Sequence, residues 1–251
     1  MNQTTAVPTA GPVLALEGTY NFRSTAGYPA AAGRLRENAL FRSDALHRLS
    51  EDDQRVFSAQ GISRVIDLRD SEELRHSPNA IPAGPTETVH HPIFGSGAGL
   101  PAIAGSFSID SVYRYMIEHR ADRVAGAVRL IADAPEGGVL VHCTAGKDRT
   151  GVVVAFALTA VGVPRDQVIA DYAASAANLA GEWAERMLAA SAERFGEFDG
   201  DARELIVGSP AEAIDRTLDL IEDGYGGVER MLLQHGLDDD ALDRLQRRLV
   251  A

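Results

Sequence analysis

Apolar and polar residues follow two different periods along the first two thirds of the chain. Five short runs rich in apolar and β-branched residues predict strands at residues 13–16, 39–42, 63–68, 87–94 and 138–143. Between them, Ser50 and three following acids are typical of a helix start, with Gln60-Gly61 closing that helix. Residues 109–132 carry apolar side chains at helical spacing. Strands alternating with helices predict an α/β fold with a central, largely parallel sheet flanked by helices.

After Pro164 nearly the whole pattern is helical. We expect an alanine-rich helical segment over 166–195 with the only tryptophan, Trp183, and then a breaker-rich loop over 196–208. The residues Ser-Pro-Ala-Glu at 209–212 predict a capping box with proline at the first helical position. Helices over 211–223 and 228–235 follow, and Asp238 caps a last short one, so the C-terminus is expected to be helical.

The composition describes an ordinary globular protein and narrows the classes of partner. The chain has 251 residues, of which 45% are hydrophobic, and a formal net charge of −12. This charge argues against nucleic acid as a partner and against adhesion to anionic membranes, because phosphate groups would be repelled. The longest apolar stretch, 152–163, is too short to span a bilayer. We expect no stable membrane insertion, and the oligomeric state is left open.

A single cysteine, Cys143, excludes an intramolecular disulfide, a CxxC redox motif and a multi-cysteine zinc site. One cysteine suits a reducing compartment, and the N-terminal residues show no positive region followed by an apolar run of the signal-peptide kind. We therefore expect a cytoplasmic protein, with export by a route that needs no signal peptide as the open alternative.

The cysteine lies between an apolar strand and an apolar helix, in VLVHCTAGKDRTGVVVAFAL at 139–158. A strand, a short loop and a helix N-terminus make a cradle for anions, because backbone N–H groups point inward and the helix dipole favours negative charge. Such surroundings bring the pKa of a cysteine into the range of roughly 3.5–7.5. We expect Cys143 to be ionised and nucleophilic at neutral pH.

Other residues of the same stretch fit phosphoryl transfer. The guanidinium of Arg149 can hold two phosphoryl oxygens while the sulfur attacks in line. Gly146 permits a turn with positive φ. Thr150 is a candidate donor to the sulfur when water breaks a phosphocysteine, and His142 is expected to shape the loop through a bond to its backbone. The predicted phosphate-binding residues are Thr144, Ala145, Gly146, Lys147, Asp148 and Arg149.

The loop sequence allows two simpler interpretations. In the first interpretation, Cys143 is a buried core cysteine, because free cysteines are commonly buried. In the second interpretation, the segment is a nucleotide-binding loop, whose pattern is GxxxxGK followed by Ser or Thr. This interpretation fails, because the pattern needs glycine where Val141 stands and Ser or Thr where Asp148 stands.

The segment HCTAGKDRTG matches the HCx5R signature, followed by Ser or Thr, of cysteine-dependent phosphatases. Its AGKDR interior resembles the bacterial tyrosine phosphatase family typified by mycobacterial protein tyrosine phosphatase B. Further segments agree from about residue 14 to 250. They are NFRSTAGY at 21–28, LFRSDAL at 40–46, GISRVIDLRDSEE at 61–73, ADYAAS at 170–175, YGGVERML at 225–232 and GLDDDALDRL at 236–245.

The resemblance implies a phosphatase that hydrolyses phosphotyrosine through a phosphocysteine, often with tolerance for phosphoserine, phosphothreonine or phosphoinositides. Lys147 adds positive charge that can meet a second phosphate, which favours the broader range. In NFRSTAGY the sequence departs from the family, which usually has an aspartate and a further glycine where Ser24, Thr25 and Ala26 stand.

The reaction needs an acid to protonate the leaving oxygen. The sequence has no Trp-Pro-Asp tripeptide, and Asp148 is our choice because the resembling family uses that loop position. A carboxylate that braces the loop is its alternative role. Asp110, just before a helix, is the second candidate, and Asp67 at a strand end is expected to support the loop or an arginine. Arg42 and Arg69 are possible substrate-binding cations, although charged strand ends are usually solvated.

We divide the chain into a flexible tail, 1–12, and a single phosphatase domain, 13–251. Within it, a segment of about 166–208 is expected to form a mobile helical lid, because its alanines offer little apolar area to hold it down. A plainly packed helix is the alternative. The expected partner is a phosphorylated protein or phosphoinositide substrate, with no metal and no organic cofactor. The rival functions are an inactive phosphate-binding protein and a rhodanese-like sulfurtransferase.

Overall fold

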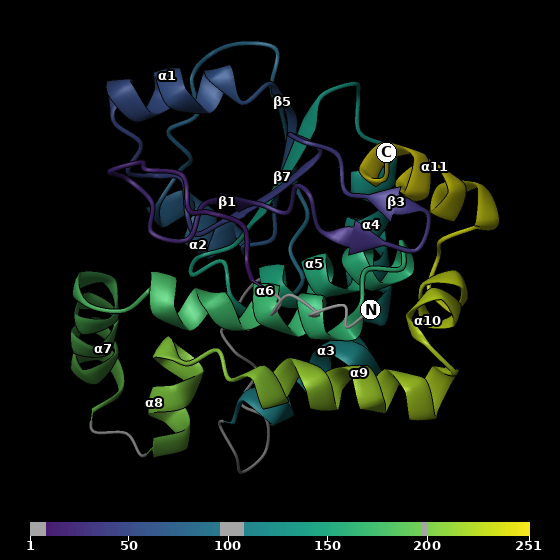
Figure 1. The fold of residues 1–251 in the computed structure, drawn as a ribbon. Coiled ribbons are helices and arrows are strands. Elements are labelled where there is room, and N and C mark those ends of the chain that lie inside the picture. The colour runs from purple at the N-terminus through teal and green to yellow at the C-terminus, as the bar shows by residue number, and fades with distance from the viewer. Residues whose placement is uncertain (1–8, 96–107, 197–199) are drawn as a thin grey trace, which may run out of the picture.

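The structure is a computed structural model that describes residues 9–95, 108–196 and 200–251 (Figure 1). Its main sheet has the strand order β1-β4-β7-β5-β6, in which β1 is antiparallel to β4 and the other pairs are parallel. A separate hairpin pairs β2 with β3. The strands are β1 (Arg23–Ser24), β2 (Pro29–Ala30), β3 (Gly33–Arg34), β4 (Leu40–Ser43), β5 (Ile62–Asp67), β6 (Glu87–His90) and β7 (Gly138–His142).

Eleven helices lie within the described residues, so the expected α/β fold with a largely parallel sheet is confirmed. The first five helices along the chain lie between the strands or directly follow the last strand, β7. They are α1 (Glu51–Ala59), α2 (Ser71–His76), α3 (Ile109–His119), α4 (Ala121–Ala132) and α5 (Asp148–Ala160). The C-terminal third contains α6 (Arg165–Asn178), α7 (Glu182–Phe195), α8 (Gly200–Val207), α9 (Ala211–Tyr225), α10 (Val228–Gln234) and α11 (Asp239–Leu249). No helix of the described part is long and apolar enough to cross a lipid bilayer.

The alternation of side chains along the strands divides the core into two layers. In β7, Val139 and Val141 belong to the larger apolar cluster, which α3 to α6 and α8 to α11 complete. Leu140 belongs to a smaller cluster with Phe57 of α1. Successive strand residues point to opposite faces, and both faces of a parallel sheet are covered. Figure 1 accordingly shows α1 on the opposite side of the sheet from α4 and α5.

The strand register brings three polar residues to one edge of the sheet. His142 at the end of β7 is paired with Ser43 of β4 on one side and with Asp67 of β5 on the other. These are the carboxyl ends of parallel strands, where sites of open α/β sheets gather. The loop between β7 and α5 therefore begins at the edge where a site is expected.

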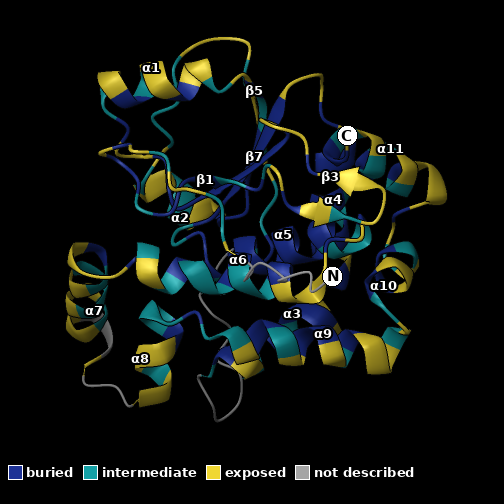
Figure 2. Ribbon diagram, viewed as in Figure 1, coloured by how far each residue is buried: buried dark blue, intermediate teal, exposed yellow. Residues whose placement is uncertain are grey.

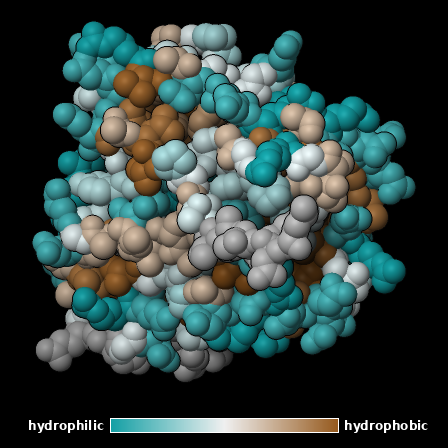
Figure 3. Space-filling view, viewed as in Figure 1, coloured by the Kyte–Doolittle hydropathy of each residue, from teal (hydrophilic) through white to brown (hydrophobic). Residues whose placement is uncertain are grey.

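The helices differ strongly in how deeply they are packed. In α5, residues 150–158 are all buried, whereas in α7 Trp183 is the one buried residue among 182–193 (Figure 2). Figure 3 shows a mostly polar face with small apolar patches, one of them over α7 and α8. The helix that follows the cysteine is thus part of the core, and α7 is attached mainly through one side chain.

Three helix predictions are corrected by the structure. The segment 109–132 is two helices, because Arg120 leaves helical geometry with φ −136° and ψ 18°. The segment 166–195 is also two helices, separated at Gly181, whose φ of +77° favours glycine. The loop predicted over 196–208 contains the helix α8 between its glycines, so the glycines mark helix ends there.

Strand and cap predictions need corrections of the same kind. Residues 13–16 form only an isolated bridge from Val13 to Arg23, and the run 87–94 is a strand only to His90, shortly before Pro92. The capping box at 209–212 does not form. Pro210 occupies the N-cap of α9, and the hydroxyl of Ser209 donates to the carbonyl of Tyr172 instead.

The predicted tail lies mostly outside the described residues, which begin at residue 9. Its described part contacts the domain. The carbonyl of Thr9 accepts a hydrogen bond from the side chain of Gln167, and the N–H of Gly11 donates to the hydroxyl of Tyr28. Residues 9–12 therefore lie against α6 and the segment that follows β1.

Candidate active site

Cys143 follows β7 directly, and its side chain is enclosed by the loop that it begins. It is 2% exposed, and the N–H of Gly146 donates to its Sγ over 3.3 Å. Gly146 has a φ of +67°, and a Cβ there would lie 2.2 Å from the carbonyl oxygen of Ser43. Only glycine fits at this position, and the backbone that it permits aims an amide at the sulfur.

Arg149, in the first turn of α5, makes a bidentate ion pair with Glu73 of α2. Its Nη1 and Nη2 lie 2.6 and 2.8 Å from the two carboxylate oxygens, and one of these oxygens also accepts a hydrogen bond from the hydroxyl of Thr144. Burial acts to raise the pKa of Glu73, but these donors outweigh it and lower the pKa to about 2. The carboxylate of Glu73 is thus bound to the guanidinium of Arg149 at the edge of the cysteine loop.

Asp148 is the first residue of α5, and its carboxylate accepts two hydrogen bonds. The hydroxyl of Tyr113 and the ammonium of Lys147 each lie 2.9 Å away, and the side chain is 22% exposed. Lys147 itself is buried and also donates to the carbonyl of Leu205 in α8 over 2.8 Å. The ammonium of Lys147 therefore joins the loop to α8, and Asp148 remains accessible to solvent at a helix N-terminus.

Asp67 and His142 lie beneath the loop, fully buried. Asp67 accepts bonds from the guanidinium of Arg69 at 2.9 and 2.7 Å, and Nε2 of His142 lies 3.4 Å from it. Burial acts to raise the pKa of Asp67, but His142 and Arg69 outweigh it and hold that pKa well below its ordinary value. The other ring nitrogen of His142 is 3.2 Å from the carbonyl of Cys143. Asp67 and His142 therefore connect β5 to the start of the cysteine loop.

The remaining candidates are placed differently. Asp110 is half exposed and paired with Arg216 of α9 over 2.9 Å. The hydroxyl of Thr150 is buried and makes no hydrogen bond within the described residues. Arg42 and Arg69 are both buried, contrary to the expectation that charged strand ends are solvated. No three side chains of metal-binding type cluster in the described part of the chain.

Beside the loop lies a cavity of about 160 Å³. Thr144 contributes to one wall, and α7 contributes another through Trp183 and Arg186, whose guanidinium lies 5.3 Å from the ring of Tyr20. The other lining residues are Gly18, Asp44, Ala45, His47, Arg48 and Met187. The cavity joins the cysteine loop to the helix that is least deeply packed.

Sequence reasoning missed several polar residues that contact the loop or hold the side chains that contact it. They are Asn21, Arg23, Glu73, Tyr113, Asp171 and Ser175. All except Tyr113 lie in segments that carry the family resemblance, such as NFRSTAGY, DLRDSEE and ADYAAS. Charged residues within otherwise apolar runs were the available signal, since charges inside a core are almost always paired.

The fold and the loop together define an α/β protein with a cysteine in an anion-binding cradle, which is the arrangement of the cysteine-dependent phosphatases. The model of the tyrosine phosphatase family matches residues 14–251. The chain therefore belongs to the tyrosine phosphatase family, and it is a protein phosphatase that acts on phosphorylated substrates.

Individual relatives agree with this assignment. The triple specificity protein phosphatase PtpB of Mycobacterium tuberculosis is 36% identical over 188 residues, which is 62% of this chain and 67% of that protein. A tyrosine-protein phosphatase of Nostoc commune is 28% identical over 233 residues, 84% of this chain and 74% of its own length. A putative tyrosine-protein phosphatase of Cupriavidus necator is 30% identical over 174 residues, 63% and 61% respectively.

Proposed function

We propose that this phosphatase hydrolyses phosphotyrosine through a phosphocysteine at Cys143. The observation that carries the proposal is the enclosed sulfur, which accepts the amide of Gly146 at 3.3 Å in the loop that leads to Arg149. The thiolate attacks phosphorus in line, the ester P–O bond breaks, and the leaving oxygen takes a proton. Water then attacks phosphorus, the P–S bond breaks, and phosphate and the thiolate are released.

Arg149 binds the phosphoryl oxygens and stabilises the charge of the transition state in this scheme. Glu73 and Thr144 engage three of its five N–H groups, so the guanidinium has further N–H groups to offer a phosphate. The pair with Glu73 is only partly buried, at 14% and 29% exposure, so a phosphate with two charges can also compete with the carboxylate. Thr150, with its buried hydroxyl, is the donor to the departing sulfur.

Asp148 is the general acid of the first step and the base of the second. Its place in the loop and its partial exposure support this role, and the hydroxyl of Tyr113 holds the carboxylate in position. Asp110 is held by Arg216 at the surface, and Asp67 is fully buried against Arg69, so both have less support. Lys147 keeps its ammonium 2.9 Å from Asp148 and thereby ties the acid to the loop.

The substrate range extends beyond phosphotyrosine to phosphoserine, phosphothreonine and phosphoinositides. The name of the mycobacterial relative, a triple specificity phosphatase, supports a wide range. His47, Arg48 and Arg186 line the cavity beside Thr144, which supports binding of a second phosphate there. The free, buried Cys143 supports work in a reducing compartment such as the cytoplasm.

The lid is formed by α7 and α8. In α6, Asp171 and Tyr172 are buried and tied into the core, whereas α7 buries Trp183 beside the loop and leaves its other described positions partly or fully exposed. Slow hydrogen exchange in α6 and fast exchange in α7 are the expected result. Amides in 182–193 that exchange as slowly as those of 152–158 would contradict a mobile lid.

A substrate panel tests the function directly. Phosphotyrosine, phosphoserine and phosphothreonine peptides and phosphoinositides are compared, with Cys143→Ser expected to lose activity on the order of 10³-fold or more on every substrate. Turnover that survives in Cys143→Ser would refute the mechanism.

The acid is tested with two leaving groups. Asp148→Asn is expected to lose about 10²–10⁴ in kcat for a tyrosine or serine ester, and much less for a nitrophenyl ester whose leaving oxygen needs no proton. Asp110→Asn is the matched control, and a leaving-group-dependent loss in that variant instead would move the acid to Asp110.

A further inference from the structure

The outward-facing carbonyls of the cysteine loop are held by side chains from two distant segments. Nδ2 of Asn21, just before β1, donates to the carbonyls of Ala145 and Gly146, each over 3.1 Å. Nη2 of Arg42 in β4 donates to the carbonyl of Gly146 over 2.8 Å. Both side chains are fully buried, so water does not compete for these carbonyls.

Holding these carbonyls also sets the direction of the loop amides. In a trans peptide the C=O and the following N–H point in opposite directions. Anchoring the carbonyl of Ala145 outward therefore turns the N–H of Gly146 inward, where it lies 3.3 Å from Sγ of Cys143. Anchoring the carbonyl of Gly146 turns the N–H of Lys147 to the inner side in the same way.

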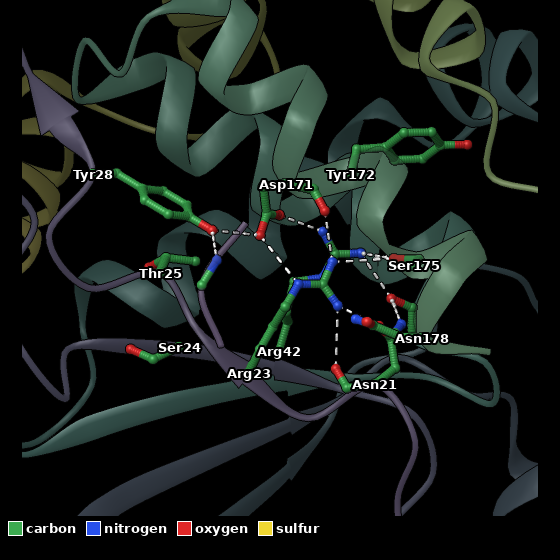
Figure 4. Close-up of polar contacts among 12 residues, drawn as sticks. Asn21, Arg23, Ser24, Thr25, Tyr28, Arg42, Asp171, Tyr172, Ser175 and Asn178 are labelled. Atoms are coloured by element: carbon green, nitrogen blue, oxygen red, sulfur yellow. Dashed lines mark hydrogen bonds and ion pairs between the residues drawn. The ribbon is translucent and has the colours of Figure 1, made fainter. Parts of the chain in front are cut away.

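Asn21 and Arg42 are themselves fixed by α6 (Figure 4). Nη1 of Arg42 lies 2.5 Å from the carboxylate of Asp171, and the hydroxyl of Ser175 accepts from Nη2 of Arg42 at 3.3 Å. The Oδ1 of Asn21 accepts hydrogen bonds from Asn178 and from Arg23. Since both the oxygen and the nitrogen of the Asn21 side-chain amide have partners, its donor is oriented toward the loop.

The same cluster contains more guanidinium groups than carboxylates. Arg23 and Arg42 share the single carboxylate of Asp171, and all three are at most 1% exposed. Burial and the neighbouring Arg42 lower the pKa of Arg23 to about 10, which leaves it charged at neutral pH. Two guanidinium groups and one carboxylate thus lie behind the loop that is proposed to hold a thiolate and receive a phosphate.

We propose that Asn21 and Arg42 are positioning residues of the phosphatase, which aim the amides of Gly146 and Lys147 at the sulfur and the phosphoryl group by holding the opposite carbonyls. This proposal rests on the proposed function of the loop. Neither side chain contacts the reacting atoms, and both act through the backbone. Preorganised amides of this kind stabilise charge in the transition state without reorganising during the reaction.

The experiment compares Asn21→Ala with Ser175→Ala in the full chain. Both variants remove one polar group from the same buried cluster, but only Asn21 contacts the loop. The readouts are the pH profile of Cys143 alkylation by iodoacetamide, the inhibition by vanadate, and kcat and KM. For Asn21→Ala we expect about tenfold slower alkylation at neutral pH, weaker vanadate inhibition and a 10- to 100-fold lower kcat. Ser175→Ala is expected to change each by less than about threefold.

Arg42→Lys adds a second, charge-conserving test, because one ammonium cannot reproduce the fork between Asp171 and Gly146. We expect it to lower kcat by about tenfold or more although the charge is kept. If Asn21→Ala does not fold by circular dichroism, Asn21→Ser, which is smaller than asparagine but polar, replaces it.

The proposal is overturned if folded Asn21 and Arg42 variants match Ser175→Ala in alkylation, vanadate inhibition and kcat. The alkylation profile needs no substrate, so it is independent of the proposed function. A wild-type protein without phosphatase turnover would refute the proposed function, and the alkylation comparison would still decide whether Asn21 and Arg42 orient the loop.

Discussion

Two arginine–carboxylate pairs contact the cysteine loop, one behind it and one in front, and they differ in burial and in charge balance. Behind the loop, Arg42 and Asp171 are 0% and 1% exposed, and a second guanidinium, that of Arg23, shares the carboxylate. In front, Arg149 and Glu73 are 14% and 29% exposed and form a one-to-one bidentate pair.

The difference separates a permanent contact from an exchangeable one. A buried pair is enclosed by protein, so nothing can replace Asp171 without leaving two guanidinium groups uncompensated. A pair at the edge of the loop is accessible to water, salt and a competing anion. We therefore expect the rear pair to maintain the shape of the loop and the front pair to be the place where phosphate meets arginine.

The comparison predicts its largest effect at Asp171. Asp171→Asn removes the carboxylate that both guanidinium groups share and turns an amide N–H toward one of them. We expect the free energy of unfolding, measured with urea, to fall by about 3–5 kcal/mol.

Tyr28→Phe is the matched control for this prediction. It removes a neutral hydroxyl that donates to the same carboxylate over 3.1 Å, and about 1 kcal/mol is expected. If the two variants lost similar stability, the rear pair would not be the stronger structural element that its burial indicates.

Asp44, a buried carboxyl group whose hydrogen-bond donors are all neutral, extends the comparison to the pH dependence of stability. Within the described residues, Asp44 accepts hydrogen bonds from the backbone of Tyr20 and Asn21 and from the hydroxyl of Ser43. Burial outweighs these donors and raises the pKa of Asp44 to about 6. Because this value lies above the ordinary one of about 3.9, the stabilising contribution is complete below pH 3.9 and is lost as the pH rises through 6.

Asp44→Asn keeps an oxygen acceptor and cannot ionise, so it should flatten this loss. We expect the free energy of unfolding of the wild type to fall by on the order of 2 kcal/mol between pH 4 and pH 7 through this group. The variant should not show this fall, so its stability relative to wild type should rise by the same amount at pH 7. Urea unfolding at both pH values measures it. Parallel stability curves for the two proteins would show that Asp44 ionises as it does in the unfolded chain.

The comparison also shows how far the sequence could predict the site. The strand and helix periods predicted four of the five strands of the sheet, β4 to β7, and missed β1. The apolar run before Cys143 predicted β7 within a residue, and the apolar run after the loop predicted that a helix follows. Local patterns suffice there, because each element is recognised from its own residues. The break at Arg120 and the helix α8 were missed, because their ends depend on packing against other elements.

The polar partners behind the loop could not be predicted in this way. Asp171 is 129 residues from Arg42 along the chain, and Arg149 is 76 residues from Glu73. Such pairs form only in the tertiary fold, so the local pattern of apolar and polar residues does not predict them. What the sequence did contain was an arginine within the apolar run LFRS and an aspartate within an alanine-rich helix, both at positions that the sheet and α5 bury.

The front pair is expected to give the smallest effect on stability. Glu73→Gln keeps the shape of the side chain and its acceptor oxygen but removes the charge that Arg149 faces. A pKa lowered to about 2 would correspond to about 3 kcal/mol, but solvent screens a partly exposed pair. We therefore expect the free energy of unfolding at pH 7 and low salt to fall by only about 1 kcal/mol. In 1 M salt the difference should shrink, because exposed charges are screened.

The pH dependence of this pair has the opposite sign to that of Asp44. Since the pKa of Glu73 is lowered to about 2, from an ordinary value of about 4.3, the contribution is present above pH 4.3 and is lost as the pH falls through 2. Glu72→Gln, at an exposed position of the same helix turn, controls for the loss of a charge at a helix N-terminus. A loss in Glu73→Gln as large as that in Asp171→Asn, and unchanged by salt, would mean that the front pair is permanent, and phosphate would then have to bind Arg149 beside Glu73 rather than in its place.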